Sequence, residues 1–130
     1  MKKFILFFCS ALFLAGCASL TVSQVNSRNR ENFVKLYVGM PRSSALAIMG
    51  RSPVDIECAN AAGKCAKQIN IANPYRTEIL QNTDRKFEVL YYAIDINNDC
   101  MVNEEGLMPL VLENNKVIGW GKEFLQSIKK

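Results

Sequence analysis

Residues 86–96 restrict the possible folds of this sequence more than any other segment. In an extended chain, the odd-numbered positions from Phe87 to Ala93 place apolar side chains on one face, and Leu90 and Tyr92 place them on the other. A strand that is apolar on both faces must be buried on both, so it lies inside a sheet with helices covering at least one side. We therefore expect residues 86–96 to form the central strand of a domain that mixes helices and strands.

Two short helices are predicted before this strand and one after it. Apolar residues follow helical spacing over residues 29–38, which Gly39 ends. They do so again over residues 45–49, in a segment that Pro41 starts and Gly50 caps. Residues 121–130 carry enough apolar side chains for one or two amphipathic turns. Helices this short are not stable alone, so each is expected to pack on the sheet.

Two hairpins complete the predicted sheet. Residues 54–58 alternate apolar and charged side chains, and residues 66–71 can return antiparallel to them. Residues 110–112 and 117–120 flank Asn114-Asn115, a pair that tolerates the positive φ of a tight turn. The expected fold class is α+β, with two short N-terminal helices, a sheet of three to five strands and a short C-terminal helical tail.

The first sixteen residues have the organisation of an export signal. Lys2 and Lys3 precede an apolar run from Phe4 to Leu14, and small residues follow the run. The run is about half as long as a helix that spans a hydrocarbon core. This length favours a cleaved signal over a membrane-spanning helix.

Residues 14–17, with the sequence Leu-Ala-Gly-Cys, resemble the lipobox of bacterial lipoproteins. The resemblance implies that Cys17 becomes the first mature residue and carries diacylglycerol and a further acyl chain such as palmitate, which together anchor a domain stably. Ala18 and Ser19 stand where lipoproteins of the inner membrane often carry Asp, so the resemblance points to the outer membrane with the domain facing the periplasm. The expected organisation is a signal peptide over 1–16, a lipidated Cys and flexible tether over 17–27, and one domain over 28–130.

Charge and composition exclude several classes of function. Sixteen basic residues face twelve acidic ones, and loss of Lys2 and Lys3 with the signal lowers the formal charge from +4 to +2. A charge this small does not indicate a nucleic-acid partner. The sequence contains no His, which is the commonest general base and metal ligand, so an enzyme is not the expected class.

Carboxylates are the remaining route to catalysis. Glu88, Asp95 and Glu105 would have to converge in a pocket to act as an acid and a base, which makes an enzyme the weakest of three functional classes. Residues 95–99 imitate the start of a calcium loop, but Cys100 stands where that loop requires glycine. We therefore expect no catalytic residue, no metal site and no cofactor.

Three cysteines remain for the mature domain, because Cys9 leaves with the signal and Cys17 carries lipid. Cys58 and Cys65 bracket a loop of small and turn-forming residues, so we expect a disulfide between them at the neck of a hairpin. Pairing of Cys100 with either of them is one alternative, and three reduced, buried thiols are the other. The sequence contains no Cys-x-x-Cys motif, so redox catalysis is not expected.

Five short motifs follow one another through the domain. They are Gly39-Met40, residues 45–53 (Ala-Leu-Ala-Ile-Met-Gly-Arg-Ser-Pro), Tyr91-Tyr92, residues 109–112 (Pro-Leu-Val-Leu) and residues 118–121 (Ile-Gly-Trp-Gly). Together they resemble the small α+β lipoproteins of the SmpA/OmlA (BamE) group and the β-lactamase-inhibitor-like fold. The resemblance covers most of residues 29–121, and the segment from Cys58 to Asn82 lies outside its pattern. It implies two helices packed on one face of an antiparallel meander.

The same resemblance implies a non-catalytic binding or scaffold module that is accessory to outer-membrane assembly or integrity, with a protein partner in the cell envelope. An inhibitor or ligand-sequestering module of the β-lactamase-inhibitor type is the alternative. Trp120 and Tyr75 are candidate partner contacts, because exposed aromatic side chains offer a large contact area at low entropic cost. A place at the edge of the buried core is the other interpretation of both residues.

Overall fold

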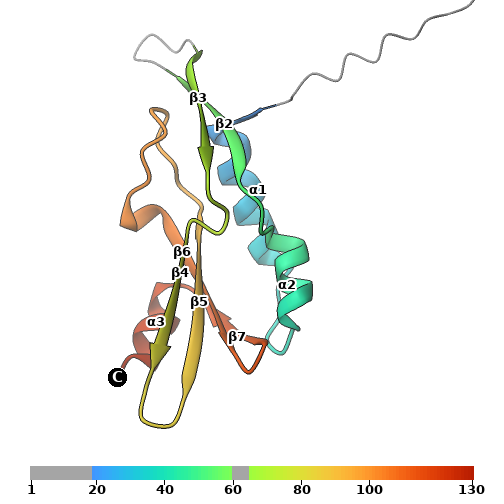
Figure 1. Ribbon diagram of the computed structural model, residues 1–130, viewed down its shortest axis with the longest axis vertical. Coiled ribbons are helices and arrows are strands. Elements are labelled where there is room, and N and C mark those ends of the chain that lie inside the picture. Colours follow the sequence, from blue (N-terminus) through green and yellow to red (C-terminus); the bar gives the residue numbers. More distant parts are fainter. Residues whose placement is uncertain (1–18, 60–64) are drawn as a thin grey trace, which may run out of the picture.

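The computed structural model describes residues 19–59 and 65–130, and these residues form an α+β fold (Figure 1). The helices are α1 (Val22–Val34), α2 (Arg42–Met49) and α3 (Lys122–Ile128), with one 3-10 turn, η1 (Glu104–Gly106). The strands are β1 (Leu20–Thr21), β2 (Val54–Ala59), β3 (Cys65–Ile71), β4 (Arg76–Gln81), β5 (Lys86–Ala93), β6 (Leu107–Glu113) and β7 (Lys116–Trp120). The predicted fold class is confirmed.

The strands form two sheets rather than one meander. In the first, β2 lies between β1 and β3, parallel to β1 and antiparallel to β3. In the second, β4, β5, β6 and β7 follow one another with antiparallel pairing throughout. Because β5 is hydrogen-bonded on both sides, it is an inner strand, as its apolar faces predict.

The two faces of β5 contribute to two separate clusters of buried side chains. One cluster joins Phe87, Val89 and Tyr91 to the start of α1, to β2 and to Leu125 of α3. The other joins Leu90 and Tyr92 to the end of α1, the following connection and α2. Helices therefore cover both faces of the second sheet, and this explains why β5 lacks a polar face.

Helix α2 and the last hairpin form where the sequence predicts them. Pro41 precedes the first residue of α2, and Gly50 ends the helix with a φ of +90°. Asn114 and Asn115 have φ values of 51° and 60°, so each adopts the left-handed conformation that the turn requires.

Helix α1 begins at Val22 rather than near residue 29, which corrects the predicted tether. The Thr21 hydroxyl accepts a hydrogen bond from the Gln24 amide at 3.2 Å, and the Gln24 side chain accepts one from the Thr21 amide at 2.9 Å. This capping box starts the helix, and Val22 and Val25 are then buried against the sheets. Residues 20–27 therefore belong to the fold, whereas Cys17 lies outside the described residues.

The disulfide joins Cys58 to Cys100, so the expected Cys58–Cys65 pairing is wrong. The β2–β3 register places Lys67 opposite Cys58 and places Cys65 opposite Ala59. Cys100 reaches β2 instead, because it lies in a loop closed by the bridge between Ile96 and Val102. The two Cα atoms are 5.5 Å apart, and the bond links the first sheet to a loop that leads out of the second.

Among residues 19–59 and 65–130, no helix has both the length and the apolar character that crossing a membrane requires.

Candidate docking surface

The connection after α1 exposes apolar side chains that the sequence assigns to a helix face. Val34, Tyr37 and Val38 are 86%, 57% and 67% exposed, whereas their neighbours Phe33 and Leu36 are buried. The three exposed residues lie within five consecutive positions, and we call residues 34–38 the docking loop. A cluster of large apolar side chains held in solvent is typical of a surface that binds a partner.

The predicted helix over 29–38 is therefore too long, because α1 ends at Val34. Residues 33–38 contain five apolar residues in six positions. A helix that packs on one side buries about three or four positions in every seven, so a short helical segment cannot bury all five. This local excess of apolar residues is the sequence signal that could have identified the exposed surface.

Backbone hydrogen bonds to the last hairpin hold the end of the docking loop in place. The Gly39 amide donates to the Val117 carbonyl at 2.7 Å, and the Val117 amide donates to the Met40 carbonyl at 2.9 Å. The Arg42 amide donates to the Asn115 carbonyl at 2.9 Å. Figure 1 shows the connection between α1 and α2 beside the turn that joins β6 to β7. The loop is thus preformed, which lowers the entropy lost on binding.

Buried side chains anchor the docking loop to the hydrophobic core. Phe33 packs its ring edge-on against Tyr92 with centroids 6.1 Å apart, and Leu36 and Met40 belong to the same buried cluster. The Tyr92 hydroxyl donates to the Gly50 carbonyl at 2.7 Å, and burial raises the pKa of Tyr92 above its ordinary value. Phe33, Leu36 and Met40 therefore face the core, while Val34, Tyr37 and Val38 face solvent.

The surroundings of the docking loop carry positive charge. Lys35 lies within the loop, and Lys116 pairs with Pro41 across the adjacent bridge. Neither lysine forms an ion pair with a carboxylate in the described part of the chain. Arg42, in contrast, donates from Nε to Glu88 at 2.6 Å, and this hydrogen bond raises the pKa of the arginine.

The aromatic residues proposed from sequence lie elsewhere. Trp120 ends β7 and is half-buried against the cluster beneath the docking loop, so it lies at the edge of the core. Tyr75 precedes β4 and is exposed, and its backbone amide donates to the Tyr91 carbonyl at 2.8 Å. Neither residue is part of the docking loop.

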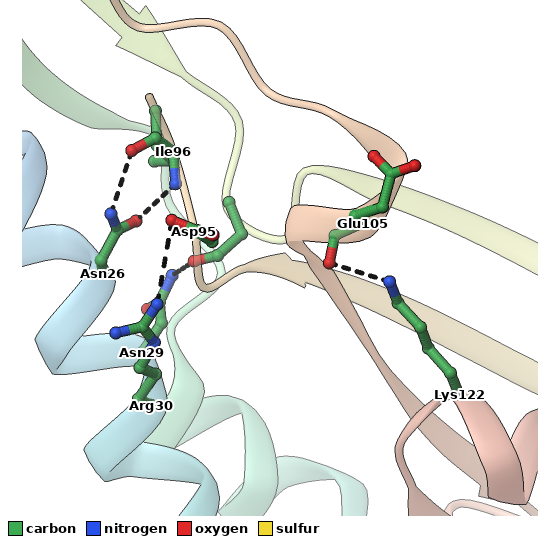
Figure 2. A network of polar contacts seen from close by, with 8 residues as sticks. Asn26, Asn29, Arg30, Asp95, Ile96, Glu105 and Lys122 are labelled. Carbon is green, nitrogen blue, oxygen red and sulfur yellow. Dashed lines mark hydrogen bonds and ion pairs between the residues drawn. The ribbon is translucent and has the colours of Figure 1, made fainter. Parts of the chain in front are cut away.

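The three acidic residues considered for catalysis contact three different basic residues, two through their carboxylates and Glu105 through its backbone. Glu88 pairs with Arg42, and Asp95 lies 3.8 Å from Arg30 of α1. Glu105 belongs to η1, where its carbonyl oxygen accepts a hydrogen bond from Lys122 at 2.8 Å (Figure 2). Within the described residues, no group of three Cys, Asp or Glu side chains is arranged to hold a metal ion.

Fold and surface together define a small α+β domain with a preformed apolar loop. The family described as "Protein of unknown function (DUF3192)" matches residues 18–127, and the chain belongs to this family. No curated protein and no solved structure matches the chain.

Proposed function

We propose that this chain is a lipid-anchored lipoprotein of the bacterial outer membrane that faces the periplasm and acts as a non-catalytic binding or scaffold module, accessory to outer-membrane assembly or integrity. The observation that carries the proposal is the exposure of Val34, Tyr37 and Val38 on a loop whose backbone is fixed. The lipobox-like Cys17 and the resemblance to the BamE group support the anchor and the setting.

The position of the docking loop favours a protein partner over the anchoring bilayer. Three chain steps separate Cys17 from Leu20, so a lipid on Cys17 would hold the start of β1 within about 11 Å of the anchored residue. Helix α1 runs for about 20 Å from that point to the docking loop. The loop is therefore at the end of α1 away from the anchor, where a periplasmic protein can reach it.

The chemistry of the docking loop indicates what such a partner presents. Three apolar side chains fit an apolar groove or face, and Tyr37 adds a hydroxyl that can take a hydrogen bond at the rim. Lys35 and Lys116 would meet carboxylates around that face. We infer a protein partner with an apolar site bordered by acidic residues.

Photo-crosslinking in intact cells tests this proposal. A photoreactive amino acid at position 37 of the full-length chain is expected to give one adduct with a defined envelope protein, and the adduct should disappear when Val34 and Val38 are changed to Ser. Ile79 on β4 is 52% exposed and provides the matched control position. Adducts with lipid alone, or equal capture from positions 37 and 79, would contradict the proposal.

Lipid attachment is tested separately. Labelled palmitate is expected to enter the wild-type chain and a Cys9→Ser variant, but not a Cys17→Ser variant. The wild-type chain should fractionate with the outer membrane, and loss of Cys17 should release it from membranes. A Cys17→Ser chain that stayed in the outer-membrane fraction would remove the basis for the anchor.

A further inference from the structure

Two arginines differ from the other four in having no carboxylate partner. The paired arginines are Arg30 with Asp95, Arg42 with Glu88, Arg76 with Glu104 and Arg85 with Glu113. Arg28 and Arg51 have no carboxylate oxygen within 4.0 Å in the part of the chain that the structure describes. Both side chains are exposed, so their charges are available to a ligand.

Both of these arginines line the same groove, which has a volume of about 480 Å³. Arg28 lies on α1, and Asn32 lies one turn further along the same face of that helix. The opposite wall is formed by the end of α2 and by residues 50–54, which include Arg51. No Asp or Glu lines the groove, so the positive charge of the two guanidinium groups is not neutralised there.

Two buried side-chain amides, those of Asn32 and Asn73, also favour a negative charge in the groove. Asn32 accepts a hydrogen bond from Lys35 at 3.1 Å through its side-chain oxygen, which holds a third cation next to a residue that lines the groove. Asn73 donates from Nδ2 to the Met49 carbonyl at 3.1 Å. A carbonyl oxygen at the end of α2, which would repel an anion, is thereby occupied.

A second pocket also contains basic residues but differs from the groove in its balance of charge. It has a volume of about 350 Å³ beside α3 and contains Arg76, Lys122 and Lys129. Its walls also contain three carboxylates, Glu78, Glu104 and Glu105, and Arg76 is hydrogen-bonded to one of them. Positive charge in that pocket is balanced by the protein itself, whereas in the groove beside Arg28 it is not.

We propose that the groove between α1 and residues 50–54 binds an oxyanion, the phosphate or carboxylate group of a ligand, between Arg28 and Arg51. Guanidinium groups suit this chemistry because each presents several N–H donors in one plane and keeps its charge at any physiological pH. The proposal goes beyond the binding function inferred above, because it depends neither on the lipid anchor nor on the exposed apolar side chains of the docking loop.

Titration of the full-length protein in a neutral detergent tests the site. Inorganic phosphate and acetate are added separately at constant ionic strength, and binding is followed by calorimetry and by the amide NMR signals of Arg51 and Ser52. We expect saturable binding of at least one of the two anions at one site per chain. Arg28→Gln and Arg51→Gln should each weaken that binding at least tenfold.

Arg30→Gln is the matched control, because Arg30 lies on the same helix and carries the same charge but pairs with Asp95. It should leave the affinity within a factor of two. Circular dichroism of each variant separates loss of the site from loss of the fold. Equal weakening by all three substitutions, or no saturable binding of either anion, would overturn the proposal.

Vesicles separate a lipid headgroup from a soluble source of the oxyanion. Phosphatidylcholine vesicles with and without phosphatidic acid are added to the same protein. A lipid source predicts that phosphatidic acid shifts the Ser52 amide signal and competes with inorganic phosphate, and that Arg51→Gln abolishes the shift. A soluble source predicts that phosphate or acetate shifts this signal and that phosphatidic acid does not.

Discussion

The Asn29 side chain donates from Nδ2 to the Ala93 carbonyl at 2.7 Å and joins α1 to the last residue of β5 from a position that is 1% exposed (Figure 2). One turn earlier, Asn26 accepts from the Ile96 amide at 2.8 Å and donates to the Ile96 carbonyl at 3.1 Å. Side-chain amides of α1 thus form hydrogen bonds with backbone groups at the end of β5 and just beyond it, where no strand among the described residues supplies them. These contacts fix α1 against the second sheet and thereby fix the docking loop at its end.

Asn29→Ala is expected to lower the free energy of unfolding by about 1–3 kcal/mol, because it leaves the Ala93 carbonyl buried without its donor. Ser27→Ala is the control, since Ser27 is exposed on the same helix and its loss should change stability by no more than about 0.5 kcal/mol. Urea denaturation of both variants measures the difference. Equal stability of the two variants would show that the Asn29 contact contributes nothing.

Gly50→Ala is expected to destabilise the protein more than Gly39→Ala does. Both glycines have φ near +90°, so both substitutions place a Cβ in a sparsely populated backbone conformation that costs about 1–3 kcal/mol. A Cβ at Gly50 would lie 2.8 Å from Asn73 Nδ2, whereas a Cβ at Gly39 would have nothing within 4 Å. Thermal unfolding of the pair isolates this contact, and equal melting temperatures would contradict it.

The Cys58–Cys100 disulfide closes a loop with a sequence separation of 42 residues. On the chain-entropy relation, its loss should lower the free energy of unfolding by about 4 kcal/mol. The comparison is between Cys58→Ala with Cys100→Ala and the wild-type chain under oxidising conditions. Cys65→Ala is the control and should retain the bond. Mass spectrometry of unreduced peptides identifies the pair, and a peptide joining Cys58 to Cys65 would contradict the assignment.

The sequence predicts well those elements whose local pattern and tertiary environment agree. β5 is recognisable because it is apolar on both faces, and the structure buries both. The β6–β7 turn is recognisable because Asn114-Asn115 tolerates positive φ. Helix α2 is recognisable because Pro41 and Gly50 mark its two ends.

The elements that were missed either lack a local apolar pattern or depend on distant contacts. β4 pairs only with β5 and is one of the two edge strands of its sheet, so most of its side chains are exposed and its sequence lacks an apolar face. The start of α1 carries few apolar residues, but Val22 and Val25 find buried sites on the sheets. Cys100 is far from Cys58 in sequence, and only the loop between Ile96 and Val102 brings them together.

The exposed pair of Arg76 and Glu104 gives a prediction about pH. The hydrogen bond from Arg76 holds the pKa of Glu104 below its ordinary value of 4.5. A lowered pKa means that the pair favours the folded state above that ordinary value and that this contribution is lost as the pH falls through the folded pKa. Because both side chains face solvent, the effect on stability is small.

Arg76→Gln should therefore return the pKa of Glu104 upward, toward its ordinary value. Arg85→Gln, which removes an exposed arginine paired with Glu113 instead, should leave the Glu104 titration unchanged. Carbon-13 NMR of the side-chain carboxyl groups follows both titrations. A Glu104 pKa that is the same in all three proteins would show that the Arg76 pair does not form in solution.

The Cys58–Cys100 bond makes completion of this fold depend on the compartment in which the chain resides. Disulfides persist where thiols are oxidised and are rare where glutathione and thioredoxin keep them reduced. A chain retained among reduced thiols would lack the covalent link between the first sheet and the loop that leads out of the second, and it would open and be degraded more readily. If the chain is exported as proposed, a precursor without this bond would be loose enough to pass through an export channel, and bond formation in the periplasm would then lock the domain.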